Sequence, residues 1–430
     1  MTEIILIFFQ IFFIGFLIKL SIPNIKINSV LTTSLTESLT LKSIIFINLL
    51  LVFSLLNISL NYLIISLIVI SLIFILKEKE KFKINFNFNF KNFLIFIYIF
   101  IVSIALTYDL QLGWDAKFFW FLKTINFYQD NSLLNLEKLP ATDYPHLGSY
   151  IWSFFWRFPF DSYEYLGRIF YVFLYVISIF YFCEIFESNE TYKLILSSLI
   201  ILTTFDIELF NGNQEIIIFS LILVAAKLSY ELVAKKIKNP INHLIFLLLS
   251  FNAALWIKNE GLFLLGFILF ITLFFGNLNL KQKKFVVSIS VFLIATRFMI
   301  LYFLNSELES FEFEKTFNYS FFENLTLNLK TISFYSFVYS LSLPVIISSL
   351  LILLLNIYLF KIDKIQLFII FYLILNVLFI FMSFMLSMES VEWQVRVGLK
   401  RVMFESSGFY LLTIVYLFNK VKKNDSTNFS

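Results

Sequence analysis

The sequence predicts an all-α fold, a polytopic transmembrane helical bundle of about 11–13 helices. Of the 430 residues, 60% are hydrophobic and only 14% are charged, and the mean hydropathy is +0.86. Soluble globular domains contain about 45–50% apolar and about 25% charged residues. Long apolar runs, and an uneven division of basic residues between loops, also indicate a membrane protein. We therefore interpret residues 1–430 as a single transmembrane domain.

The apolar runs between charged breaks define the expected spans. A hydrocarbon core of about 30 Å needs roughly 17–25 residues per helix. About 13 runs approach that length, although the sixth is short and is expected to tilt or to insert only in part. They are Ile4–Leu20, Ser43–Ile58, Tyr62–Leu76, Phe93–Thr107, Leu166–Phe186, Leu194–Phe205, Ile216–Val233, His243–Trp256, Leu262–Gly276, Phe285–Leu304, Phe334–Phe360, Ile365–Met388 and Val402–Phe418.

Lysine and arginine are unevenly divided between alternate loops. By this threading about 19 of the 33 basic residues lie on one side, the side that holds Lys77–Lys83, Lys281–Lys284 and the tail 420–430. Basic loops stay in the cytoplasm, so this side is predicted to be cytoplasmic. The opposite, outer face then receives a long loop over 108–165, with amphipathic helices, and a second large loop over 305–332. The expected location is the plasma membrane.

Several classes of function are excluded by composition. The 33 basic and 29 acidic residues nearly cancel, which speaks against a nucleic-acid partner. No P-loop or glycine-rich nucleotide motif occurs, which speaks against an ATP-driven pump. The one cysteine, Cys183, rules out a disulfide framework, and two histidines cannot build a histidine metal cluster. No cofactor is expected with certainty, but a divalent cation held by carboxylates alone stays open.

The first outer loop contains the most informative segment. From Trp114 to Lys123 aromatic residues recur at helical spacing, which predicts an amphipathic helix lying in the membrane interface. Asp115 would open this helix, where a carboxylate is stabilised by the exposed N–H groups. The alternative is a general base at the membrane surface, with Asp109 as a second acidic residue in the same loop.

Further along the same loop, an acid, a tyrosine and a histidine surround a proline. Asp143, Tyr144 and His146 could bind substrate. The structural alternative is a turn that starts a helix at Pro145, because proline favours the first helical position and an extended residue before it.

Other charged residues are predicted at the same outer face. Glu215 begins a span, and Lys258 and Glu260 lie in a polar turn that Asn259 and Gly261 would explain without a function. As a point charge, Lys258 could hold a phosphate. Ionisable groups at membrane depth are costly and often mark a substrate path.

A basic cluster precedes the last span. It contains Arg396, Lys400 and Arg401. Arginine pairs bidentately with phosphate oxygens, which favours a substrate phosphate site. The alternative is a juxtamembrane cluster that binds membrane lipid head groups.

These segments together resemble the GT-C superfamily of polytopic glycosyltransferases, in particular bacterial members akin to protein mannosyltransferases and lipid A aminoarabinose transferases. The N-terminal part departs from the family pattern. The family usually has its catalytic loop directly after the first helix, whereas here the loop follows the fourth predicted span. The resemblance extends from Asp109 to Gly408 and rests on Gly113–Ala116 (GWDA) with Trp120 and Lys123, Asp143–Pro145 (DYP), Asn211–Glu215 (NGNQE), Lys258–Gly261 (KNEG) and Arg401.

The resemblance implies a transferase that moves a sugar from a polyprenyl-phosphate donor to a lipid, glycan or protein acceptor at the periplasmic face of the inner membrane. By position, Asp115 would be the catalytic base, with Asp109 as the competing assignment. Lys258, Arg396 and Arg401 would bind the donor phosphate.

Two other classes compete with this interpretation. A transporter or flippase of lipid-linked sugars also has many spans, but such proteins tend to show paired halves and helices broken by glycine or proline. A surface-polysaccharide ligase or polymerase would normally have a basic late outer loop, whereas 305–332 is acidic here.

Overall fold

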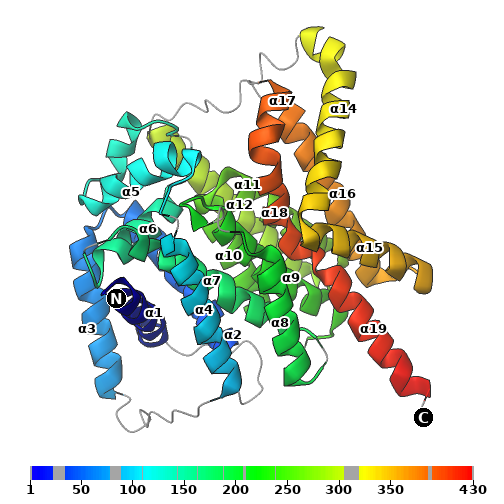
Figure 1. Ribbon diagram of the computed structural model, residues 1–430, viewed down its shortest axis with the longest axis horizontal. Helices are drawn as coiled ribbons and strands as arrows, with labels where there is room; N and C mark the ends of the chain where they lie inside the picture. The colour runs from blue at the N-terminus through cyan, green and yellow to red at the C-terminus, as the bar shows by residue number, and fades with distance from the viewer. Residues whose placement is uncertain are drawn as a thin grey trace. The chain divides into compact units, whose positions relative to one another are not determined.

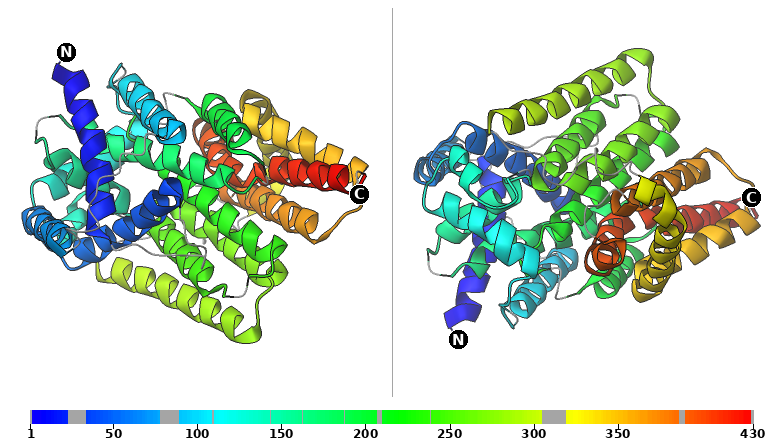
Figure 2. Two further views of the ribbon diagram at one scale, coloured as in Figure 1. Left: turned by 90° about the horizontal axis from the view of Figure 1, so that it is seen from below. Right: turned by 90° about the horizontal axis from the view of Figure 1, so that it is seen from above.

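The computed structural model describes residues 2–22, 34–77, 89–108, 110–142, 144–161, 163–186, 188–206, 210–237, 239–304, 319–385 and 390–428. Every element in these ranges is helical, which confirms the all-α prediction (Figure 1 and Figure 2). Within the same ranges, 8 helices are long and apolar enough to cross a membrane, or up to 9 if one bent pair forms a single span. Three further apolar helices are shorter. The helices thus have the lengths and composition of a multi-pass membrane protein.

The chain divides into two compact units. Unit 1 comprises residues 1–181, 206–217 and 252–258, and unit 2 comprises 182–205, 218–251 and 259–430. The unit boundaries fall inside three helices, so each unit is assembled from segments that are distant in sequence.

Unit 1 begins with four helices, and the first of them contacts the other three. Their bounds are α1 Thr2–Ser21, α2 Leu35–Leu55, α3 Leu60–Lys77 and α4 Phe90–Tyr108. On α1, the buried amide of Gln10 donates to the carbonyl oxygen of Phe155 at 2.9 Å. Phenylalanine rings join α1 to α4, as between Phe8 and Phe96 at 5.6 Å. Lipid-facing apolar side chains and a few interior polar links are what a membrane bundle requires.

The segment predicted to be amphipathic is helical and two-sided. Residues 108–165, which were predicted to form the first outer loop, contain η1 Ala116–Trp120, α5 Phe121–Tyr128, η2 Leu133–Lys138 and α6 Leu147–Arg157. Trp114 and Phe118 are exposed, whereas Trp120 and Lys123 are buried. The aromatic side of the segment is therefore available to a membrane interface, and a lysine lies on its buried side.

Helix α7 (Tyr165–Cys183) completes the core of unit 1 by close backbone packing against α6. A Cβ atom on Gly167 would lie 2.3 Å from the carbonyl oxygen of Trp152 and 3.0 Å from the backbone nitrogen of Trp156. Only a glycine allows the two backbones to approach this closely.

The first helices of unit 2 come from the middle of the chain. They are α8 Glu190–Thr204, most of α9 (Glu215–Ala234) and α10 (Ile241–Ile257), α11 Asn259–Phe275 and α12 Leu280–Phe303. The predicted short span corresponds to α8, which has 15 residues and is not among the helices of spanning length.

One predicted span in the second half of unit 2 is wrong. Residues 334–360 were expected to form one helix, but α14 (Tyr319–Ser342) and α15 (Pro344–Leu359) meet at a bend of 97° (Figure 1). Leu343 is extended and Pro344 begins the new helix, because proline lacks the N–H that a continuing helix needs.

The remaining helices of unit 2 follow α15 along the chain. They are α16 Lys364–Met385, α17 Val391–Gln394, η4 Val395–Leu399, α18 Lys400–Tyr410 and α19 Leu412–Asn428. The second large loop was predicted over residues 305–332. The structure describes this segment only from residue 319, where α14 starts. The predicted tail 420–430 is helical as far as Asn428.

We predict that Gly167→Ala destabilises the protein by about 1–3 kcal/mol or more, because the added methyl meets backbone atoms that cannot rotate away. Thermal unfolding of the purified protein in detergent would measure this loss. Gly15→Ala in α1 is the matched control, because a Cβ there meets nothing closer than 3.9 Å. Equal unfolding temperatures for the two variants would contradict the packing at Gly167.

Candidate active site

In the run Asn211–Glu215, residues 211–214 form a tight loop in unit 1, and Glu215 begins α9. Gly212 has φ +94°, a conformation that residues with a side chain rarely adopt. A Cβ atom on Gly212 would lie 2.8 Å from the ring of Trp152 and 3.0 Å from Ala116. Glycine is therefore required at this position both by the backbone angle and by the close neighbours.

The GWDA run, Gly113–Ala116, lies against the loop that contains Gly212. The Gly113 N–H donates to the carbonyl oxygen of Asn211 at 2.9 Å. A Cβ on Gly113 would lie 2.9 Å from Asn211 Oδ1 and 3.0 Å from Asn213 Nδ2. Two of the sequence runs that carry the family resemblance thus meet in unit 1, and both side-chain amides lie over the Gly113 backbone.

Gln214 is fully buried against α6 and α7. A Cβ on Gly148 would lie 1.9 Å from Gln214 Oε1, so the glycine leaves room for this amide. The Tyr171 hydroxyl donates to the Gly148 carbonyl at 2.8 Å and lies 3.5 Å from Gln214 Nε2. Within the part of the chain that the structure describes, the side-chain oxygens of Gln214 and of the buried Asn213 have no hydrogen-bond partner. Buried amide oxygens of this kind are suited to accept hydrogen bonds from a ligand.

A buried arginine anchors the start of the loop. Arg168 on α7 is completely inaccessible to solvent, and its Nη1 donates to the Phe210 carbonyl at 2.8 Å. Its Nη2 donates to Glu164 Oε1 at 2.7 Å, and the guanidinium lies 5.6 Å from the centre of the Trp152 ring. Burial raises the pKa of the Glu164 carboxyl, and the charge of Arg168 partly offsets that rise.

Glu215 and Lys258 form a buried ion pair. Lys258 Nζ lies 3.0 Å from Glu215 Oε1, and the side chains are 8% and 2% exposed. Both residues were predicted at the outer face from separate parts of the sequence, and the structure brings them into direct contact. Because each neutralises the other, the pair can be buried where a single charge could not.

Asp115 lies in the helical segment that contacts this loop. The residue is half-buried, has helical backbone angles and makes no capping hydrogen bond to the helix. The Tyr144 ring stacks on Phe119 at 5.9 Å and packs edge-on against Trp120 at 5.6 Å. The buried ammonium of Lys123 donates to the carbonyl oxygens of Ala141 and Tyr144, each at 2.7 Å, and so ties these two residues to α5.

His146 precedes α6 and contacts a different set of residues. It is 3% exposed, and its Nε2 lies 2.9 Å from Ser54 Oγ. Its ring packs edge-on against Trp256 at 5.5 Å, two residues before Lys258. The structure thus places His146 beneath the surface, between α2 and the end of α10.

The other predicted site residues are in unit 2 or outside the described ranges. Glu260 lies in the first turn of α11, and Arg401 is half-buried near the start of α18. Arg396 is exposed, is ion-paired with Glu392, and donates from Nε to the Tyr335 hydroxyl at 2.7 Å. Asp109 and Asp143 lie outside the described residues. Among the residues that the structure does describe, no three His, Cys, Asp or Glu side chains converge as a metal site.

Two buried arginines escaped the sequence analysis. Arg168 and Arg297 lie within predicted spans, and Arg297 is 5% exposed and hydrogen-bonded to Asn259 at the start of α11. An arginine inside an apolar run is itself a signal for a functional or anchoring role. The sequence of a span does not indicate which residue its arginine contacts.

The chain matches no family model, no curated protein and no solved structure.

We predict that Lys258→Met destabilises the protein by about 3–5 kcal/mol, because it leaves the Glu215 carboxylate buried without its cation. The double variant Glu215→Gln, Lys258→Met is expected to recover most of that loss. Thermal unfolding of the wild type, both single variants and the double variant forms the thermodynamic cycle that measures the coupling. Strictly additive effects would contradict the pair.

Proposed function

We propose that the protein is a membrane glycosyltransferase that moves a sugar from a polyprenyl-phosphate donor to a lipid, glycan or protein acceptor. Its active site would face the periplasm from the bacterial inner membrane. The proposal includes a GT-C-like fold of 11–13 spans, in which the three shorter apolar helices also cross the bilayer.

The observation that carries the proposal is the contact between GWDA and NGNQE at Gly113 and Asn211. The site that they frame contains a half-buried carboxylate at Asp115, two buried amide oxygens and the Glu215–Lys258 ion pair. A carboxylate can serve as a base, and amides can orient sugar hydroxyls.

The proposed reaction is a single displacement. The acceptor oxygen or nitrogen attacks the anomeric carbon of the donor, and its proton passes to the Asp115 carboxylate. The bond between the anomeric carbon and the phosphate oxygen breaks, and the polyprenyl phosphate leaves with the electron pair. The enzyme contributes by holding base and acceptor in line with that bond.

The leaving phosphate needs positive charge close to it. The proposed phosphate-binding residues are Lys258, Arg396 and Arg401. Arginine offers the planar donor geometry that pairs with two phosphate oxygens, and lysine offers a compact point charge.

We predict that Asp115→Asn abolishes sugar transfer, with a rate loss of about 10²–10⁴-fold, because the amide cannot accept the proton. The measurement is transfer of radiolabel from a panel of polyprenyl-phosphate hexoses and pentoses in membranes that carry each variant. Glu137→Gln is the matched control, because Glu137 is an exposed carboxylate of the same loop.

Asp109→Asn tests the competing base. Loss of transfer with this variant alone would move the base to Asp109. If no donor is consumed while labelled lipid-linked sugar changes leaflet, the protein is a flippase and the transferase proposal is wrong.

We predict that a cysteine at Glu137 reacts with a membrane-impermeant maleimide on intact cells, whereas one at Lys281 reacts only after permeabilisation. Both would be introduced into a Cys183→Ser background. The expectation follows from the sorting of basic residues, which assigns Lys281 to the cytoplasm. The reverse labelling pattern would invert the topology and move the proposed site to the cytoplasm.

A further inference from the structure

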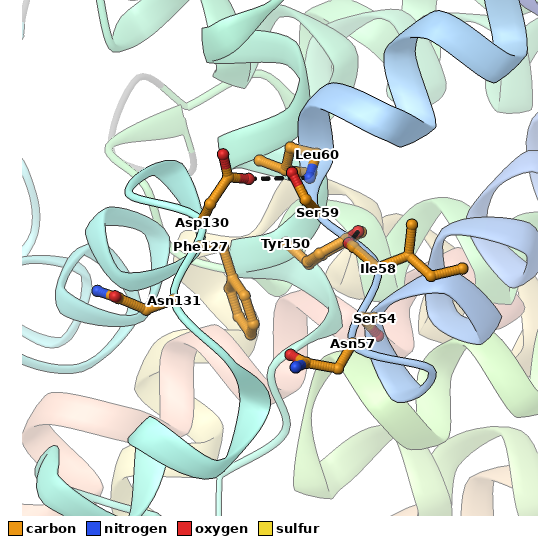
Figure 3. Close-up of a pocket in the computed structure, with 9 residues that line it drawn as sticks. All are labelled: Ser54, Asn57, Ile58, Ser59, Leu60, Phe127, Asp130, Asn131 and Tyr150. Carbon is orange, nitrogen blue, oxygen red and sulfur yellow. Dashed lines mark hydrogen bonds between the residues drawn. The ribbon is translucent and has the colours of Figure 1, made fainter.

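Unit 1 contains a cavity of about 60 Å³ between the α2–α3 turn, the end of α5, and α6 (Figure 3). In the same measure a water molecule needs about 10–15 Å³, so several waters or one edge of a sugar ring would fit. Asp130 and Asn131 at its rim are exposed, which leaves the cavity open to a larger ligand. None of its lining residues belongs to the loop around Gly212.

The cavity wall combines a ring face with hydroxyl and amide groups. Phe127 and Tyr150 pack edge to face at 5.1 Å. The Tyr150 residue is 3% exposed, and its hydroxyl reaches the Ile58 carbonyl only at 3.5 Å, the limit of a hydrogen bond. Asn57 and Ser59 add further polar side chains to the lining. This mixture suits a ligand that both donates and accepts hydrogen bonds.

The lining has no uncompensated charge. Asp130 is its one ionisable carboxylate, and Oδ2 lies 2.9 Å from Arg157 Nη1. Oδ1 accepts from the Leu60 N–H at 2.9 Å, as drawn in Figure 3. A carboxylate neutralised in this way attracts neither a cation nor a phosphate. It retains lone pairs that can accept from a hydroxyl.

The cavity is held by unusual backbone geometry and by a polar floor. Among the described residues, three that are not glycine have positive φ, and two of them, Asn57 at 55° and Asp130 at 56°, line this cavity. Such conformations tend to gather at functional sites. Below, Ser54 is hydrogen-bonded to His146, which packs on Trp256. The floor is thus linked through packed side chains to the segment that carries Lys258.

We propose that this cavity is a second binding site, which takes the hydroxyl-bearing edge of a neutral sugar. Phe127 and Tyr150 supply the ring contact, and the Tyr150 hydroxyl, Asn57 and Asp130 bind the sugar hydroxyls. The assignment goes beyond the proposed function, because it concerns binding and holds whether or not the protein transfers sugar.

The test is direct binding of methyl glycosides of mannose, glucose, galactose and arabinose to the full-length protein in detergent, by saturation-transfer NMR titration. At least one glycoside should bind, and Tyr150→Phe should weaken it about three- to tenfold through loss of one hydrogen bond. Ser59→Leu should block binding by filling the cavity. Tyr163→Phe is the matched control, since Tyr163 is exposed and outside the cavity.

The proposal is overturned if no glycoside binds, if Tyr150→Phe and Ser59→Leu bind as tightly as the control while remaining folded, or if inorganic phosphate or calcium displaces the glycoside. Glycoside binding without sugar transfer would support this binding site and contradict the transferase proposal. Sugar transfer without glycoside binding would support the transferase proposal and contradict this binding site.

Discussion

The geometry of the candidate site depends on the hydrogen bond from the buried Arg168 guanidinium to the Phe210 carbonyl. A charged side chain inside an apolar bundle needs compensating partners, because an uncompensated charge there costs several kcal/mol. Glu164 and the Trp152 ring complete the surroundings of Arg168. Trp152 in turn lies against Gly212. The buried charge of Arg168 is therefore coupled to the position of the loop.

Glycine provides the second constraint. The chain has only 10 glycines, yet Gly113, Gly148 and Gly212 all lie where a side chain would collide with the Asn211–Glu215 loop or its neighbours. The atoms that a Cβ would meet at these three glycines belong to side chains, among them those of Asn211, Gln214 and Trp152. Each glycine therefore leaves room for larger side chains that pack around one polar loop.

Two polar regions of unit 1 therefore have different characters. Around Gly212, buried amides and the Glu215–Lys258 ion pair form a tightly packed region that contacts the helical segment of Asp115. Around Tyr150, a small cavity is lined by groups without net charge. His146 and Trp256 connect the second region to the segment of Lys258. A donor that carries a phosphate needs charged groups around it, whereas a neutral sugar needs uncharged hydrogen-bonding groups. This difference is the physical basis of the two proposals.

The sequence by itself determined the all-α class, the positions of most apolar helices and the amphipathic character around Trp114, because these follow from hydrophobicity and its period. It also predicted one face for Glu215 and Lys258 from the alternation of loops. Only the tertiary structure decided that these two residues pair and that GWDA meets NGNQE, because such contacts depend on the relative placement of helices far apart in sequence. It also decided that Lys123 and Arg168 are buried and that Pro344 divides residues 334–360 into two helices. Hydropathy averages over a window and cannot register the backbone contact that one glycine allows, the partner that one arginine finds or the bend that one proline imposes.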